Sequence, residues 1–365
     1  MDTELERILF AADEKDFPPV SQERGEVTYA EKYRNIRTAL QPIHANVEKS
    51  ALANSLKQYI DEVRTHQEPD DAETIISNIP VIYLNNHGHG HVEKVIDRIY
   101  GLLTIMDVNL SGYELFVLLC AVQLHDVGNI FGREGHEKTL QKVSYEQCAP
   151  HIKDTPERKL IEKIAATHGG NYNGNKDVIS LLPQEQMVKE QKVRCRLLAS
   201  LLRFADEIAD DSTRADLEGI KMGTIPNDSL LFHYYSLALH TVKIEKDSVN
   251  GSVFLNLVFD YDSDVAIKKF DKFGKEIYLL DEIYERTKKM ELERRYCTRF
   301  MRPYLDLERI KVSINISNME DIFNVKSINY DLFERGYPNS ECIIEDTLTG
   351  EELKNLFVKE EYNHE

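Results

Sequence analysis

The residues best suited to chemistry are an adjacent pair, His125-Asp126, and a set of histidines and an aspartate spread around it along the chain. One imidazole nitrogen and one carboxylate oxygen on neighbouring residues can bind the same divalent cation. His91 precedes the pair by 34 residues, and Asp206 closes the series. We predict a mixed nitrogen and oxygen site formed by these four residues, in which the Asp126 carboxylate bridges two cations.

Two further histidines, His136 and His168, follow the pair and are candidate ligands for a second cation. Each has an ordinary alternative: His136 lies in a polar, glycine-bearing loop, where surface histidines are common, and His168 at a helix end could interact with the helix dipole. Asp206 could instead form salt bridges with Arg203. The whole ordered set is hard to obtain by chance, and it predicts one or two divalent ions, chosen from Mn²⁺, Fe²⁺, Ni²⁺, Co²⁺, Zn²⁺ and Mg²⁺.

The order H…HD…H…H…D on predicted helices resembles the HD superfamily of metal-dependent phosphohydrolases, over roughly residues 86–215. The resemblance implies that metal-bound hydroxide hydrolyses a nucleotide, a cyclic nucleotide or a related phosphoester. The two histidines after the pair resemble the dinuclear branch of that superfamily. Some dinuclear members have two adjacent histidines where this chain has Thr167-His168. This departure weakens the resemblance at the predicted site of the second metal ion.

Positively charged side chains near the predicted ligands are candidates for phosphate contact. Arg203 lies in a mostly apolar predicted helix, where a guanidinium needs a partner, and Arg133 lies three residues before His136. We assign catalytic roles to Asp126, Arg203 and Arg133. The candidate substrate-binding residues, for which a loop position or a surface ion pair is the alternative, are His87, His89 and Lys138.

A second group of arginines lies far from the histidines along the sequence. Arg295, Arg299 and Arg302 recur at a spacing that places them on one face of a long predicted helix. In so acidic a chain this face could bind phosphate or a partner. Pairing with Glu291 and Glu293 on a solvated helix surface is the alternative.

The metal-binding residues require helices to position them, and apolar residues recur at helical spacing around each one. Pro42 is expected to kink or divide the first helical segment. The predicted helices cover residues 27–66, 91–103, 115–124, 161–168 and 193–209.

After about residue 219 the apolar residues alternate instead. Asn250-Gly251 between two alternating runs predicts a β-hairpin. A long helix, residues 276–301, is expected to stop before Pro303, and residues 310–316 predict another strand. The aromatic stretch 232–235 could be a core strand or part of a cleft, and residues 342–344 could form a short strand.

These elements predict a mainly α fold, an HD-type helical bundle, with a C-terminal α+β domain. The predicted divisions are an N-terminal helical segment (1–85), the HD metal-binding domain (86–218), the α+β domain (219–318) and a C-terminal extension (319–365).

Composition limits the classes of protein that the chain can be. Its longest uninterrupted apolar run, Leu115–Val122, is too short to cross a membrane, which takes about 20 residues, and the charged N-terminus does not resemble a signal peptide. Five scattered cysteines favour reduced thiols in a cytoplasmic protein. A net charge of −18 disfavours a long nucleic-acid partner but allows a phosphorylated small molecule beside a cation. For assembly, the many apolar helices suggest a homodimer.

The alternative to an enzyme is a regulatory module that keeps the HD fold but binds a nucleotide or a protein without turnover. The α+β appendage leaves room for this function. The intact set of His91, His125, Asp126 and Asp206 weighs against it, because a module without turnover has less need of every ligand. We therefore predict an HD-type metal-dependent phosphohydrolase.

Overall fold

The computed structural model describes residues 2–16, 27–46, 89–106, 109–128, 136–169, 174–223, 225–302, 304–318, 325–336, 341–344 and 348–362. Contacts divide the chain into two compact units. The first contains residues 1–51, 87–209 and 296–306, and the second contains residues 52–86, 210–295 and 307–365. The four divisions expected from the sequence stay a prediction.

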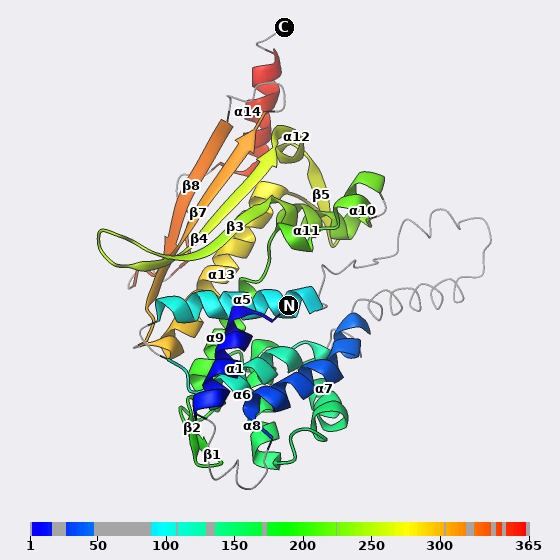
Figure 1. Cartoon of the computed structure of the whole chain (residues 1–365). Coiled ribbons are helices and arrows are strands. Elements are labelled where there is room, and N and C mark those ends of the chain that lie inside the picture. The colour runs from blue at the N-terminus through cyan, green and yellow to red at the C-terminus, as the bar shows by residue number, and fades with distance from the viewer. Residues whose placement is uncertain are drawn as a thin grey trace, which may run out of the picture. The chain divides into compact units, whose positions relative to one another are not determined.

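The first unit is helical (Figure 1). Residues 29–46 are helical throughout. The helix therefore does not divide at Pro42, which was one of the two outcomes that we expected there. A small hairpin, β1 (Gln186–Val188) and β2 (Gln191–Val193), ends just before the helix that begins at Cys195. The named helices and turns are α1 (Glu4–Asp16), α5 (His89–Ile105), α6 (Gly112–Leu124), α7 (His136–Val143), the π-helical η3 (Ser144–Cys148), α8 (Thr155–Ala166), the 3₁₀ turns η4 (Thr167–Gly169) and η5 (Ile179–Leu181), and α9 (Cys195–Glu207).

Helix α6 is the centre of this unit. All thirteen of its residues are buried, and it packs against α1, α5, α8 and α9. Its start is fixed by a capping box, in which the Ser111 side chain accepts from the Glu114 backbone and the Glu114 carboxylate accepts from the Ser111 N–H. A helix that is apolar on every side can only be stable when other helices surround it.

Glu114 also holds α9 to α6. Its carboxylate accepts hydrogen bonds from Nε, Nη2 and the backbone N–H of Arg194, the residue just before α9 begins. Burial alone would raise the pKa of the Glu114 carboxyl, but the bonds from Arg194 and Ser111 outweigh burial and lower that pKa. The charged pair therefore ties the beginnings of the two helices that lead to the predicted metal ligands.

The second unit contains a four-stranded sheet in the order β3-β4-β7-β8 (Figure 1). The predicted hairpin is confirmed: β3 (Leu239–Lys246) and β4 (Val253–Asp262) pair antiparallel, and Gly251 adopts a φ of 74° in the turn. β7 (Leu307–Ser317) pairs parallel with β4, a connection that the long helix α13 (Leu279–Met301) supplies. β8 (Val325–Phe333) completes the sheet antiparallel to β7.

Several expectations for this unit were wrong. The aromatic stretch 232–235 is helical, within α11 (Asn227–Ala238). Residues 342–344 form no strand, and the C-terminal extension contains a helix that we did not predict, α14 (Gly350–Tyr362). The long helix begins later than expected because a hairpin of β5 (Lys269–Lys272) and β6 (Lys275–Tyr278) precedes it. The remaining short elements are η6 (Ser212–Arg214), α10 (Leu217–Met222) and α12 (Ser263–Ala266).

The fold class is nevertheless as predicted: mainly α, with a C-terminal α+β part. All five cysteines are free, and four of them are buried. In the described ranges no helix combines the length and the apolar character that crossing a membrane requires.

The buried pair between α6 and α9 yields a stability prediction. Glu114→Gln keeps the hydrogen-bond acceptor of the capping box but removes the charge that compensates Arg194. Breaking a buried pair in this way should lower the free energy of unfolding by about 3 kcal/mol in chemical denaturation. Glu4→Gln, which breaks a pair with Arg7 whose side chains are more than half exposed, is the matched control and should change it by less than about 0.5 kcal/mol. Equal losses in the two variants would contradict this role of Glu114.

The same pair predicts a dependence on pH. The pKa of Glu114 is lower in the folded chain than its usual value of 4.5, so its charge stabilises the fold above that pH. The stability difference between wild type and Glu114→Gln should be fully present at about pH 7 and should shrink as the pH falls below about 4.5. A difference that grows on acidification would have the wrong sign for this pair.

Candidate metal centre

His91 reaches the centre from the first turn of α5, where it is the third residue. The helix is held in place by an apolar face that packs into the first unit. The buried members of this face are Val92, Val95, Ile96, Ile99 and Leu102. Because α5 and α9 pack against each other, His91 meets Asp206, the penultimate residue of α9.

His125 and Asp126 follow the last residue of α6 directly. His125 is fully buried and Asp126 nearly so, and the next residue, Val127, is also fully buried. The rigid packing of α6 therefore sets the positions of both side chains. A site built at the end of a fully buried helix is better positioned than one built on a free loop.

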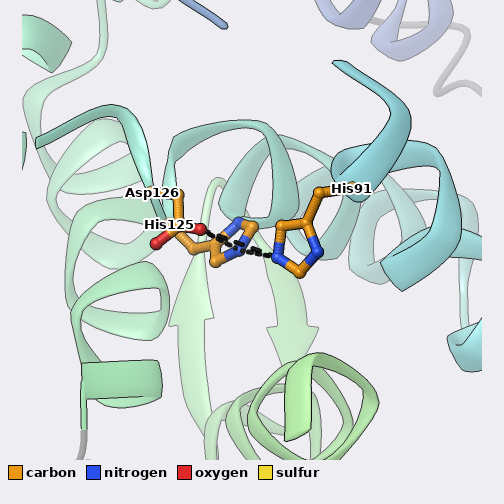
Figure 2. Close-up of side chains that lie close together, drawn as sticks. All are labelled: His91, His125 and Asp126. Atoms are coloured by element: carbon orange, nitrogen blue, oxygen red, sulfur yellow. Dashed lines mark hydrogen bonds and ion pairs between the residues drawn. The ribbon is translucent and has the colours of Figure 1, made fainter. Parts of the chain in front are cut away.

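Four side chains converge at this point, and Figure 2 shows three of them, His91, His125 and Asp126, with their polar atoms turned toward one another. Nε2 of His91 lies 3.4 Å from Nε2 of His125 and 3.6 Å from Oδ2 of Asp126. Nε2 of His125 lies 3.4 Å from Oδ2 of Asp126. Oδ1 of Asp206 lies 3.0 Å from Nε2 of His91 and 3.7 Å from Nε2 of His125.

These spacings fit a divalent cation. Ligand atoms at about 2.1 Å from one ion in tetrahedral or octahedral geometry lie about 3.0–3.4 Å from each other. Two imidazole nitrogens and two carboxylate oxygens provide a mixed donor set that suits first-row transition metals. His91, His125 and Asp126 alone already place one donor atom each within 4.8 Å of the others.

The ring of His125 is oriented for this task. Its Nδ1–H donates to the carbonyl oxygen of Val122 at 2.7 Å, which directs Nε2 and its lone pair at the other donors. His168 is held in the same way, through Nδ1 and the carbonyl of Ala165 at 2.7 Å. Both bonds reach back three residues into the preceding helix, so each ring orientation follows from local backbone geometry.

The electrostatics of the cluster reflect the charges brought together. Burial by itself would lower the pKa of His125, but the carboxylates of Asp126 and Asp206 outweigh it and raise that pKa well above 6.5. Burial would likewise raise the pKa of Asp206, yet hydrogen bonds from His125 and His91 bring it well below 3.8. The two carboxylates therefore attract positive charge at this point, whether it is carried by protons or by a cation.

The second oxygen of Asp126 faces a different histidine. Oδ1 of Asp126 lies 3.5 Å from Nε2 of His168, whereas Oδ2 faces His91 and His125. The ring of His168 meets that of His125 edge to face, with centroids 5.0 Å apart. A carboxylate whose two oxygens face different imidazoles has the arrangement needed to bridge two cations.

A buried histidine next to the cluster was missed in the sequence analysis. His44, in the helical segment 29–46, donates from Nε2 to the carbonyl of Gln123 at 2.8 Å, and burial lowers its pKa to about 4. Its neutral ring thus caps the end of α6 just before His125. Its position four residues after the core residue Leu40 is a sequence signal that it lies on the buried helix face.

The remaining predicted site residues lie in different surroundings. His89 pairs with Glu93 on its own helix, Nε2 to Oε1 at 3.2 Å. Arg203 is buried, with its guanidinium over the ring of Tyr296 at 4.6 Å. The structure gives only the backbone of His136 and Lys138, at the start of α7, and His87 and Arg133 lie outside the described residues. The roles of these residues stay predictions.

In the comparison with protein families, the model of the HD-CE family matches residues 71–289, more than half of the chain. This range contains every residue proposed for the metal centre. Comparisons with curated proteins and with solved structures found no match.

The geometry predicts where a cation binds. Chelator-treated protein titrated with Mn²⁺ should bind it, and Asp126→Asn should weaken the binding at least about 100-fold, because loss of even an outer partner of a metal ligand costs 10- to 100-fold. His168→Gln should remove only the weaker of two ions if Asp126 bridges a pair. His240→Gln, an exposed histidine on β3, is the control and should leave binding unchanged. Full Mn²⁺ affinity in Asp126→Asn would contradict the site.

Proposed function

The chain belongs to the HD-CE family, and we propose on this basis that it is a metal-dependent phosphohydrolase acting on a nucleotide, a cyclic nucleotide or a related phosphoester. The observation that carries the proposal is the convergence of His91, His125, Asp126 and Asp206 on one point. A binding module without turnover has less reason to keep two buried imidazoles and two carboxylates within bonding distance of a common cation.

The chemistry of phosphoester hydrolysis suits this donor set. A divalent ion, when bound, lowers the pKa of a coordinated water and offsets negative charge on phosphoryl oxygens. The imidazoles of His91 and His125 are positioned to present nitrogen lone pairs to it. The oxygens of Asp126 and Asp206 supply the negative charge that favours a divalent over a monovalent cation.

The surrounding residues keep these groups in place. His125 and His168 are fixed by backbone carbonyls, and the neutral ring of His44 holds the end of α6 without adding positive charge beside the cation. This preorganisation matters because small displacements of a catalytic group reduce the rate strongly. We assign substrate positioning to Arg203, whose buried guanidinium lies three residues before Asp206 on α9, and to Arg133, His87, His89 and Lys138.

The proposal predicts hydrolysis that depends on the cluster. Wild-type protein with Mn²⁺ should hydrolyse at least one member of a panel of nucleoside mono-, di- and triphosphates and cyclic mono- and dinucleotides. Asp126→Asn should lower kcat/KM at least about 100-fold, as expected for loss of a metal ligand, and His240→Gln should retain wild-type activity. The position of the bond cleaved follows from the products, separated by ion-exchange chromatography.

Two results would count against the proposal. If Asp126→Asn keeps the wild-type rate, the chemistry takes place elsewhere. If no substrate is turned over although the wild type binds Mn²⁺ and Asp126→Asn does not, the centre serves a nucleotide-sensing or protein-interaction module.

A further inference from the structure

A basic cavity lies in the first unit, apart from the metal centre. It has a volume of about 370 Å³ and is formed by η5, the residues before β1, the start of α9, and the segment at and after the end of α13. Among the described residues its lining includes four arginines and a single carboxylate, that of Glu185. The arginines are Arg194, Arg196, Arg299 and Arg302. Such a concentration of guanidinium groups is unexpected in a chain with a net charge of −18.

The arginines differ in how much positive charge they leave in the cavity. Arg194 is engaged by the Glu114 carboxylate and has a structural role. Arg196 donates from Nε to the carbonyl of Leu182 at 2.8 Å and from Nη2 to the carbonyl of Ser180 at 3.0 Å. Carbonyl oxygens orient a guanidinium without neutralising it, so Arg196 is held rigidly and keeps its charge.

Arg299, near the end of α13, and Arg302, just after it, add further charge to the lining. Arg299 pairs with Asp177 at 3.1 Å and also donates to Ser180 Oγ, with its side chain 56% exposed. Arg302 pairs with Asp306 at 2.8 Å and is 62% exposed. Exposed pairs of this kind contribute little energy, so an anion of higher charge can compete for both guanidinium groups. Arg294 and Arg295, by contrast, both pair with the buried Glu291 in the second unit.

The backbone adds to the attraction for anions. Helix α9 begins beside the cavity, at Cys195. The side chain of its N-cap residue, Arg194, makes no capping hydrogen bond, and the Glu114 carboxylate accepts the Arg194 backbone N–H. The N–H groups of the first turn of a helix and the helix dipole attract negative charge, part of which Glu114 already supplies here. Arg196 and Leu197, in this first turn, both line the cavity. Its volume falls within the range of small-molecule sites.

We propose that this cavity is a second binding site, for a small molecule that carries two or more phosphate groups. Several separated guanidinium groups match several phosphates better than one, because each can form its own charge-assisted hydrogen bonds. Arg196 and Asp206 are ten residues apart on α9, which is about 15 Å along the helix axis. The site is therefore distinct from the metal centre, and the proposal does not depend on hydrolysis there.

Binding in the presence of EDTA tests this proposal separately from the proposed function. Isothermal titration of the full chain should detect tripolyphosphate and ATP, both bound more tightly than inorganic phosphate. The double variant Arg196→Gln, Arg299→Gln should bind them at least about tenfold more weakly. Arg7→Gln with Lys221→Gln removes two exposed positive charges elsewhere and should stay within about twofold of wild type.

A gain of affinity provides a test that loss of folding cannot imitate. Glu185→Gln removes the one carboxylate among the lining residues, although Lys192 pairs with it at 2.8 Å, and should tighten tripolyphosphate binding about two- to fivefold. Three results would overturn the proposal: no binding in EDTA, equal affinity in wild type and the double arginine variant, or preference for a single-stranded oligonucleotide over tripolyphosphate.

Discussion

The arrangement of the first unit depends on the need to compensate the buried carboxylate of Asp126. A carboxylate removed from water is stable only when cations or hydrogen-bond donors surround it, and here three imidazoles face its two oxygens. These imidazoles come from α5, from the end of α6 and from the turn after α8, and Asp206 comes from α9. The helices can therefore hold the cluster together only if all four pack in one arrangement.

Helix α6 provides that arrangement because it is buried over its whole length. Its first turn is fixed by Ser111 and Glu114, and its last turn is capped by His44. Glu114 also binds Arg194, so the same residue that starts α6 anchors the beginning of α9. Helix α9 then connects two sites of opposite charge preference, the basic cavity at its N-terminus and the cation-attracting cluster near its C-terminus.

The sequence indicated which side chains converge at the candidate centre, because these residues lie at the ends of strongly periodic helices. The stripe after His91 and the apolar run before His125 leave few alternatives, and the order of residues resembled a known superfamily. The hairpin around Asn250-Gly251 was equally clear, since Asn-Gly favours one type of turn. By contrast, the β1–β2 turn uses Lys189 and Glu190 at positive φ, so it has no glycine signal and was missed.

Other features depend on tertiary packing that a single sequence does not contain. The stretch 232–235 is rich in aromatic residues, which favour strands, yet it lies within α11, where His233 and Tyr235 are both buried. The arginines near the end of α13 looked like one helix face, but Arg295 pairs with Glu291 whereas Arg299 lines the basic cavity. Arg295 belongs to the second unit and Arg299 to the first. The position at which the helix passes from one unit to the other is set by the fold, and the spacing of residues in the sequence does not reveal it.

Anomalous X-ray diffraction from crystals of the Mn²⁺-loaded protein would locate the cation directly. We expect a Mn²⁺ peak about 2.0–2.3 Å from Nε2 of His91, Nε2 of His125 and carboxylate oxygens of Asp126 and Asp206. A second peak between Asp126 and His168 would identify a dinuclear centre. If Mn²⁺ in a loaded crystal lies away from these side chains, they do not form the metal site.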